Sequence, residues 1–162
     1  MATLLFMRNA VLTIKIGAGA AADFQGQVST AAVEVEAGDT VTYPVLDGTV
    51  PSNVGPPTYA LHIVAAQDWT ATSGLANVLW NNDGATATFW LNAYGVSTAS
   101  ASQPAVTGTV TLVAPTYGGE VQTYAELDVT LPCQAKPTLS TAGAKPTLEE
   151  GEEAPAEAPA SA

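Results

Sequence analysis

The residues of this chain that could do chemistry are carboxylates, and they come in two pairs. Glu34 with Glu36, and Glu126 with Asp128, each stand two residues apart. Two carboxylates can serve as acid and base in glycoside hydrolysis, but they then flank a bond from separate elements. Residues two apart on a strand face the same side. The spacing therefore favours acidic decoration of a solvated sheet face over an acid–base pair.

Other catalytic or metal-binding patterns are missing from the sequence. His62 is its single histidine, so a Ser-His-Asp triad would depend on it alone, and Gly-x-Ser-x-Gly does not occur. Cys133 is its single cysteine, which excludes an intrachain disulfide and a cysteine-based metal site. The aspartates at 39, 47, 68 and 83 lie in no Asp-x-Asp-x-Asp-Gly calcium loop. We predict no enzymatic activity, no cofactor and no metal centre.

The charge balance narrows the possible partners. Fifteen acidic residues face four Lys and Arg, which gives a net charge of −11. Affinity for phosphates needs clustered cations, so four scattered ones predict no nucleic-acid groove. No run approaches the ~18 apolar residues of a membrane span. No positive charge precedes the apolar part of the first 22 residues, so we expect no signal peptide.

Alternating apolar and polar residues predict strands that position the carboxylates. The alternation is strictest over 122–131, where Glu126 and Asp128 face away from an apolar side. Within 28–37, Val33 and Val35 should face inward. Further strands are predicted at 11–16, 40–43, 59–66, 86–93 and 106–113. With 14 Gly and 11 Pro, the chain is predicted to be mainly β.

Two turns are predicted between these strands. Gly118-Gly119 should join two strands of the run 112–139 as a hairpin. Gly38-Asp39 should form a tight turn after the strand over 28–37.

One helix is predicted, over 73–84. Ser73 can cap its N-terminus, and its leucines and Val78 share an apolar face. A helix of about two turns cannot stand alone in water, so it must pack across the sheet. We expect four residues to anchor it: Trp69, Leu75, Leu79 and Trp80.

A segment rich in Pro and Gly interrupts the strands at 44–57. It can be neither a central strand nor a helix, and connections of this length are usually functional or mobile. We interpret it as a docking loop; a solvated insertion is the alternative. Its candidate contact residues are Asp47, Pro51, Asn53 and Pro56.

We divide the chain into a segment 1–10, a β domain 11–139 and an acidic Ala/Pro/Glu-rich tail 140–162. Beyond residue 148 the tail offers almost no apolar area to offset its ordering entropy. We expect it to be disordered or extended.

The half of the chain from 73 to 139 carries an ordered series of short motifs. These are Leu79-Trp80, Phe89-Trp90, Pro115, Gly118-Gly119-Glu120-Val121, Glu126-Leu127-Asp128, Pro132 and Lys136-Pro137. In this order they resemble the major tail tube proteins of long-tailed (siphovirus) bacteriophages, especially those of actinobacterial hosts.

The resemblance implies a β-sandwich or partly closed β-barrel with one short α-helix packed against it. Such subunits form hexameric rings that stack into the tail tube, and one sheet of each lines a lumen through which DNA leaves the virion. Terminal segments and a long loop reach the next ring, which points to 1–10 and 44–57 here. The resemblance also implies a virion-tail location after assembly in the host bacterial cytoplasm. The implied partners are tape-measure and tail-terminator proteins.

An acidic lumen would repel phosphates and let the duplex slide without specific binding. The candidate lumen-facing acids are Glu34, Glu36, Glu126 and Asp128. Strand alternation fixes their face but not its surroundings, so placement on the outer surface stays open. The alternative function is an Ig-like binding or adhesion module, or a capsid decoration protein, which the Thr- and Val-rich strands also fit.

Overall fold

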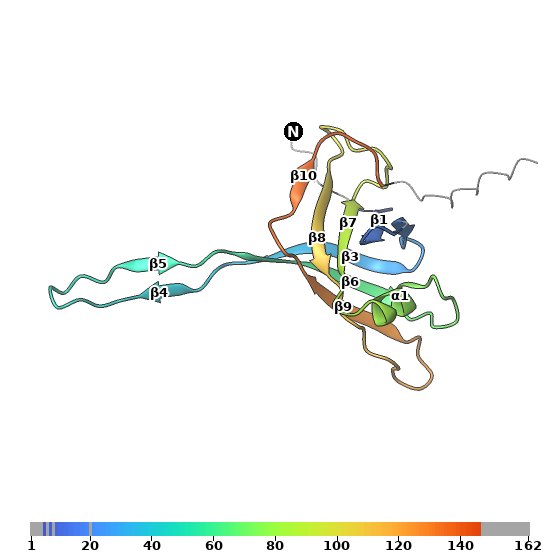
Figure 1. Ribbon diagram of the computed structural model, residues 1–162, viewed down its shortest axis with the longest axis horizontal. Helices are drawn as coiled ribbons and strands as arrows, with labels where there is room; N and C mark the ends of the chain where they lie inside the picture. Colours follow the sequence, from blue (N-terminus) through green and yellow to red (C-terminus); the bar gives the residue numbers. More distant parts are fainter. Residues whose placement is uncertain (1–4, 6, 8, 20, 147–162) are drawn as a thin grey trace, which may run out of the picture.

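Strands dominate the computed structural model of the protein, which describes residues 5, 7, 9–19 and 21–146 (Figure 1). Most of the predicted segment 1–10 and of the acidic tail therefore lies outside the described residues. A five-stranded antiparallel sheet has the order β10-β8-β7-β1-β2. Its strands are β1 (Val11–Ile16), β2 (Ala21–Asp23), β7 (Thr86–Asn92), β8 (Ala105–Thr111) and β10 (Thr138–Ser140).

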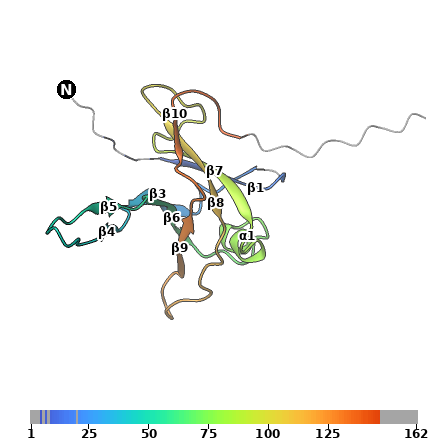
Figure 2. The same cartoon turned by 60° about the vertical axis from the view of Figure 1, so that its left-hand side comes forward.

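A second, three-stranded sheet has the order β3-β6-β9, again antiparallel. Its strands are β3 (Val28–Glu36), β6 (Thr58–Ala66) and β9 (Glu126–Pro132). A two-stranded ribbon, β4 (Thr40–Thr42) with β5 (Ser52–Val54), extends away from both sheets (Figures 1 and 2). The described chain thus confirms the mainly β fold with one short helix, and its two sheets are open.

The two sheets enclose one hydrophobic core. Alternation along each strand sends its apolar side chains inward, as a half-buried sheet requires. The sheets also adjoin at one corner, where Val110 of β8 forms an isolated bridge with Cys133. The largest fully buried side chains come from both sheets, the helix and the residues directly after β2 and β8: Phe24, Leu112, Leu12, Ile14, Phe89, Val110, Leu61, Ile63, Leu127, Leu131, Leu75 and Leu79.

The helix α1 (Leu75–Asn81) packs against this core through its buried residues Leu75, Ala76 and Leu79. Ser73 does not cap it: the N-cap is Gly74, which makes no side-chain cap hydrogen bond. Instead the amide of Leu75 donates to Gln27 Oε1 at 2.9 Å. A side chain from the residue before β3 therefore satisfies one of the amides that a helix leaves unpaired at its N-terminus.

The predicted hairpin around Gly118-Gly119 is wrong. β8 and β9 belong to different sheets, and the 112–125 segment between them contains no strand. Gly118 and Gln122 both adopt positive φ values, 97° and 71°. A left-handed residue interrupts an extended chain, so the strand predicted from residue 122 begins only at Glu126. Beyond Glu126 the alternation holds, with Leu127, Val129 and Leu131 buried.

Gly38-Asp39 is not a tight turn either. β3 continues through it into β4, and β5 leads back into β6, so one long hairpin projects from the sheet as an arm, residues 37–57 (Figure 1). A Cβ on Gly38 would lie 2.0 Å from the Gly55 carbonyl oxygen. The glycine is needed for close approach of two backbones, not for a turn. Val35, predicted to face inward, is exposed because β3 leaves the core at this end.

The chain beyond β10 stays in contact with the five-stranded sheet through residue 145. Ala144 forms a bridge with Thr98, and Lys145 pairs with Asp23 of β2. Neither β2 nor β10 was expected, because each is only three residues long and lies in a segment of small or turn-forming residues.

Candidate functional site

The four acids predicted to face a lumen lie on one face of the three-stranded sheet. In the register, Glu34 and Glu36 stand opposite Ala60 and Thr58 of β6. Asp128 and Glu126 stand opposite Val64 and Ala66 of the same strand. These β6 positions alternate with the buried Leu61, Ile63 and Ala65, so all four acids point away from the core. All four are exposed.

His62 lies at the centre of this acidic face. Its Nε2 is 2.8 Å from Asp128 Oδ1, and its Nδ1 is 3.3 Å from Glu34 Oε1. One side chain on the middle strand thereby contacts acids of both outer strands. The sequence showed no partner for His62, because both partners are distant in the chain and reach it only through the register. The strands β3, β6 and β9 contain no Lys or Arg, so His62 is the basic side chain of this face.

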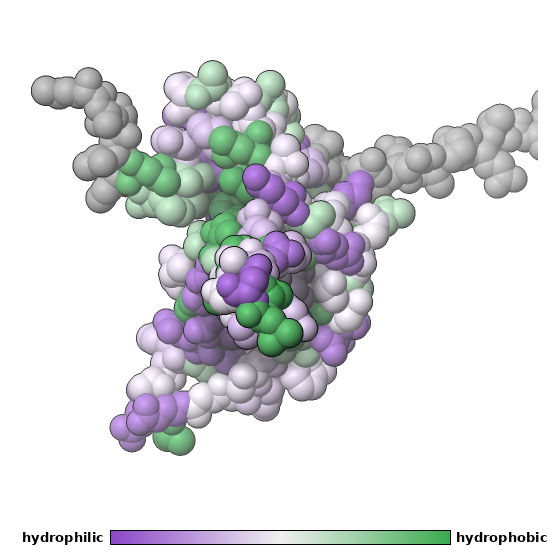
Figure 3. All heavy atoms as spheres, turned by 90° about the vertical axis from the view of Figure 1, so that its left-hand side faces the viewer, coloured by the Kyte–Doolittle hydropathy of each residue, from purple (hydrophilic) through white to green (hydrophobic). Residues whose placement is uncertain are grey.

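The arm exposes apolar side chains on both faces, with Val50 and Val54 on one face and a row of three on the other. Strand alternation places Val41, Tyr43 and Val45 on that face, and the pairing continues beyond β4 through the hydrogen bond from the Tyr43 amide to the Pro51 carbonyl, 3.0 Å. Val41 and Tyr43 are 66% and 71% exposed, and Leu46 at the tip is fully exposed. Figure 3 looks along the arm and shows apolar side chains standing out at the front of the molecule.

The predicted docking residues are spread along the arm rather than gathered in one place. Asp47 lies at the tip, Pro51 and Asn53 lie farther back, and Pro56 lies at the root; all are exposed. Asp47 stabilises the turn at the tip, because its Oδ1 accepts hydrogen bonds from the Thr49 amide at 2.8 Å and from the Thr49 hydroxyl at 2.7 Å. These bonds hold the pKa of Asp47 below its ordinary value. They also order the turn that presents Leu46.

Three aromatic residues form a cluster at the other end of β6. Trp69 contacts Trp80 with ring centroids 5.8 Å apart and Tyr117 with centroids 5.0 Å apart, both edge to face. Trp80 is 52% exposed, so the prediction that it anchors the helix in the core is wrong. It occupies the turn of α1 facing away from the core, whereas its neighbour Leu79 is fully buried. We call Trp69, Trp80 and Tyr117 the aromatic cluster.

Gln67 holds the aromatic cluster in place. Its Oε1 accepts from the Trp69 indole N–H at 2.9 Å and from the Gly118 amide at 3.1 Å. Its Nε2 donates to the carbonyls of Gly118 and Glu126 at 3.0 and 2.8 Å. The bonds to Gly118 fix the 112–125 segment, and with it the neighbouring Tyr117.

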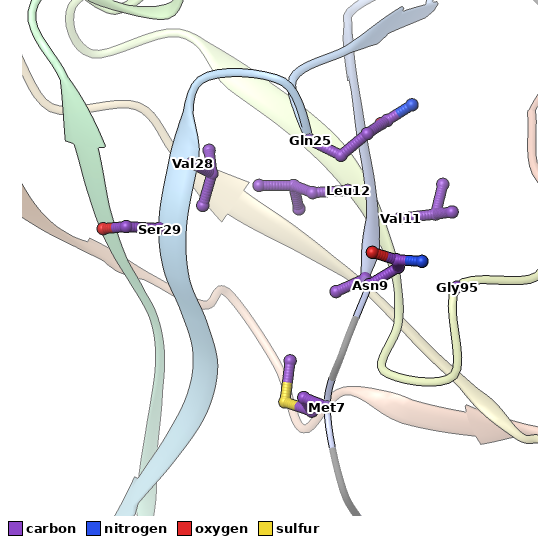
Figure 4. Close-up of a pocket in the computed structure, with 9 residues that line it drawn as sticks. Met7, Asn9, Val11, Leu12, Gln25, Val28, Ser29 and Gly95 are labelled. Carbon is purple, nitrogen blue, oxygen red and sulfur yellow. The ribbon is translucent and has the colours of Figure 1, made fainter.

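A concavity of about 460 Å³ opens between the start of β1 and the start of β3 (Figure 4). Among the described residues its lining includes Met7, Asn9, Gln25 and Ser29 but no titratable side chain. The Ser29 hydroxyl donates to the Val64 carbonyl, 3.1 Å away. Among the described residues, no group of three His, Cys, Asp or Glu is arranged to hold a metal ion. The described chain also contains no helix long and apolar enough to cross a membrane.

No family model and no curated protein sequence matches the chain. Several solved structures are similar to it, including the following two. The tail of an empty GTA particle, determined by helical refinement with C6 symmetry, is 14% identical over 80% of this chain and 95% of that chain, with a TM-score of 0.52. The cap that terminates the tube of an anti-feeding prophage is 13% identical over 88% of this chain and 95% of that chain, with a TM-score of 0.46.

The fold is tail-tube-like. At 14% identity the similarity to the GTA tail shows the fold alone. The acidic face, the arm and the aromatic cluster are described from the residues of this chain. Sequence reasoning missed two of them, the exposed apolar side chains of the arm and the aromatic cluster. A signal for the first was present in the alternating Val41, Tyr43 and Val45. No local pattern joins Tyr117 to the two tryptophans.

Proposed function

We propose that this chain is the major tail tube protein of a long-tailed bacteriophage and that it assembles as hexameric rings stacked into the tail tube. The observation that carries the proposal is the acidic face of the three-stranded sheet within a tail-tube-like fold. In the proposed assembly this face lines the lumen, and DNA passes it during ejection.

The edges of the same sheet support lateral assembly. β3 and β9 are its outer strands, and the backbone groups on their outer sides have no strand partner in the described chain. Such an edge is a template for pairing with another chain. When β9 of one copy joins β3 of the next, the sheets become continuous around a ring, and closure removes the edges.

The charge of the face supports passage of DNA without binding. Glu34, Glu36, Glu126 and Asp128 offer no cation to a phosphate, and β3, β6 and β9 contain no Lys or Arg. Tight, salt-sensitive binding to DNA needs cations that release its counterions. Repulsion between the wall and the duplex acts over about 10 Å at ordinary ionic strength, which keeps the duplex off the wall.

The proposal includes the remaining partners and the location that the resemblance implies. The subunits are made in the cytoplasm of the bacterial host, an actinobacterium, and end in the virion tail. Tape-measure and tail-terminator proteins bind the assembled tube. The role is structural, without enzymatic activity or a cofactor.

Electron microscopy of the purified protein tests assembly. The expected result is six-fold rings and long tubes. A stable monomer at high protein concentration, in enough salt to screen the repulsion between the acidic copies, would refute the proposal and favour a binding or decoration module instead.

Cysteine labelling tests which face lines the lumen. In a Cys133→Ser background, Thr130→Cys places a thiol on the acidic face opposite His62, and Thr88→Cys places one on the outer side of β7. A large polyethylene-glycol maleimide should modify Thr130→Cys in unassembled protein but not in tubes. Thr88→Cys should react in both. Rapid labelling of Thr130→Cys in intact tubes would place the acidic face outside the lumen.

A further inference from the structure

Of the side chains that β3, β6 and β9 contribute to the acidic face, His62 is the basic one, because these strands contain no Lys or Arg. An imidazole gains positive charge as the pH falls below neutrality, and its protonated nitrogens can donate to phosphate oxygens. An open histidine at the centre of this face would therefore be a phosphate contact on a wall that should not bind DNA.

Both ring nitrogens of His62 already face a carboxylate. Nε2 lies 2.8 Å from Asp128 Oδ1, and Nδ1 lies 3.3 Å from Glu34 Oε1. The side chain of His62 is 23% exposed, whereas those of Glu34 and Asp128 are 57% and 72% exposed. The two carboxylates thus flank the imidazole and are more open to solvent than it is. An approaching phosphate therefore meets negative charge before it meets a ring nitrogen.

The register of the sheet separates the four acids into a near pair and a far pair. Glu34 and Asp128 each stand opposite a β6 residue two positions from His62, and they reach the imidazole diagonally. Glu36 and Glu126 stand opposite β6 residues four positions from it, which is about 13 Å along a strand. Charges that far apart are largely screened in about 0.1 M salt, where the Debye length is about 10 Å. Of the four acids, the near pair is therefore the one placed to cover His62.

We infer that Glu34 and Asp128 mask His62 from phosphates, and that these two acids determine that the wall does not bind DNA, whereas Glu36 and Glu126 add general repulsion. The inference rests on the proposed function, and it assigns different tasks to acids of equal charge on one face. His62 contacts side chains of both outer strands and, while it is masked, offers no cation to the duplex.

Two double variants with the same change in net charge separate masking from general repulsion. Glu34→Gln with Asp128→Asn removes the acids that contact His62, and the matched control, Glu36→Gln with Glu126→Gln, removes the far pair. All four side chains are exposed, so both proteins should fold, as circular dichroism will show. Adding His62→Gln to the first variant removes the imidazole and keeps its neutral surroundings. Any variant that stays unassembled is compared with its control as subunits coupled to beads.

Sedimentation of tubes assembled with a short fluorescent DNA duplex, at about pH 6 and 0.1 M salt, measures retention of DNA. Tubes of the unaltered protein and of the matched control should leave the duplex in the supernatant. Tubes of Glu34→Gln with Asp128→Asn should retain several-fold more, and higher salt should release it, as phosphate contacts require.

Adding His62→Gln should abolish this retention. Equal retention by the two double variants, or retention that survives His62→Gln, would overturn the inference. Absence of tubes from the unaltered protein would instead refute the proposed function.

Discussion

Gln67 gives the sharpest test of how the 112–125 segment is held. The change to leucine keeps a branched side chain of comparable size, one atom shorter, but removes four hydrogen bonds, to Trp69, Glu126 and both backbone groups of Gly118. A net hydrogen bond contributes about 0.5–1.5 kcal/mol, and water can replace part of each bond at this half-exposed site. Taking the low end for all four bonds, we expect a loss of about 2 kcal/mol in the free energy of unfolding.

Urea unfolding followed by tryptophan fluorescence measures that loss, and the melting temperature should fall by about 4–8 °C. Hydrogen exchange supplies the local test, because the Gly118 amide loses its acceptor and should exchange faster. Gln134→Leu is the matched control. It removes bonds to Thr86 and Thr111 on the other sheet and leaves 112–125 untouched. Unchanged protection at Gly118 in folded Gln67→Leu protein would refute the role given to Gln67.

Three further predictions follow from burial and charge. Leu79→Ala should lower the free energy of unfolding, measured in urea, by about 3 kcal/mol, because the side chain of Leu79 is fully buried. Trp80→Ala should lower it by less, because Trp80 is larger but half-exposed. A larger loss for Trp80→Ala than for Leu79→Ala would contradict the packing of α1. Burial would raise the pKa of Asp23, but the hydrogen bonds from Lys145 and Thr13 outweigh it, so the folded pKa lies below the ordinary value. Asp23 therefore stabilises the fold above its unfolded pKa and loses this contribution as the pH falls through the lower folded value. The free energy of unfolding of Asp23→Asn, measured by melting, should be about 1 kcal/mol lower than that of the unaltered protein at pH 7. This difference should disappear in acid. A difference that does not depend on pH would count against the ion pair. Burial raises the pKa of the Cys133 thiol, so the folded protein should react with a small maleimide at pH 7.5 more slowly than glutathione does, and equal rates would show an open thiol.

Strands with one buried face were predictable from the sequence because alternation is a local property. The strand predicted at 11–16 is β1, and the run from Glu126 alternates as expected. Turns were less predictable, because a glycine has several uses. Gly38 allows two backbones to approach, and Gly118 bends a segment that never pairs as a hairpin. Both glycines looked like hairpin turns in the sequence.

The acidic face shows a different limit. The spacing of two residues predicted that Glu34 and Glu36 face the same side of one strand, and likewise Glu126 and Asp128. Both pairs do share a side of their strands. Nothing in either pair indicated that β6 would lie between them or that His62 would contact one acid of each. That arrangement depends on register between strands distant in the sequence, which turn geometry and core packing determine together.

The β3–β6 hairpin changes character where it leaves the sheet. Up to Glu36 its strands lie over the core and their outer face carries acids. Beyond the close contact of Gly38 with Gly55, the same hairpin forms an arm that exposes apolar side chains. An acidic face repels its copies and DNA alike, and an apolar face attracts another apolar surface. One continuous hairpin thus joins an acidic sheet face to an apolar extension, and the change takes place at a pair of glycines.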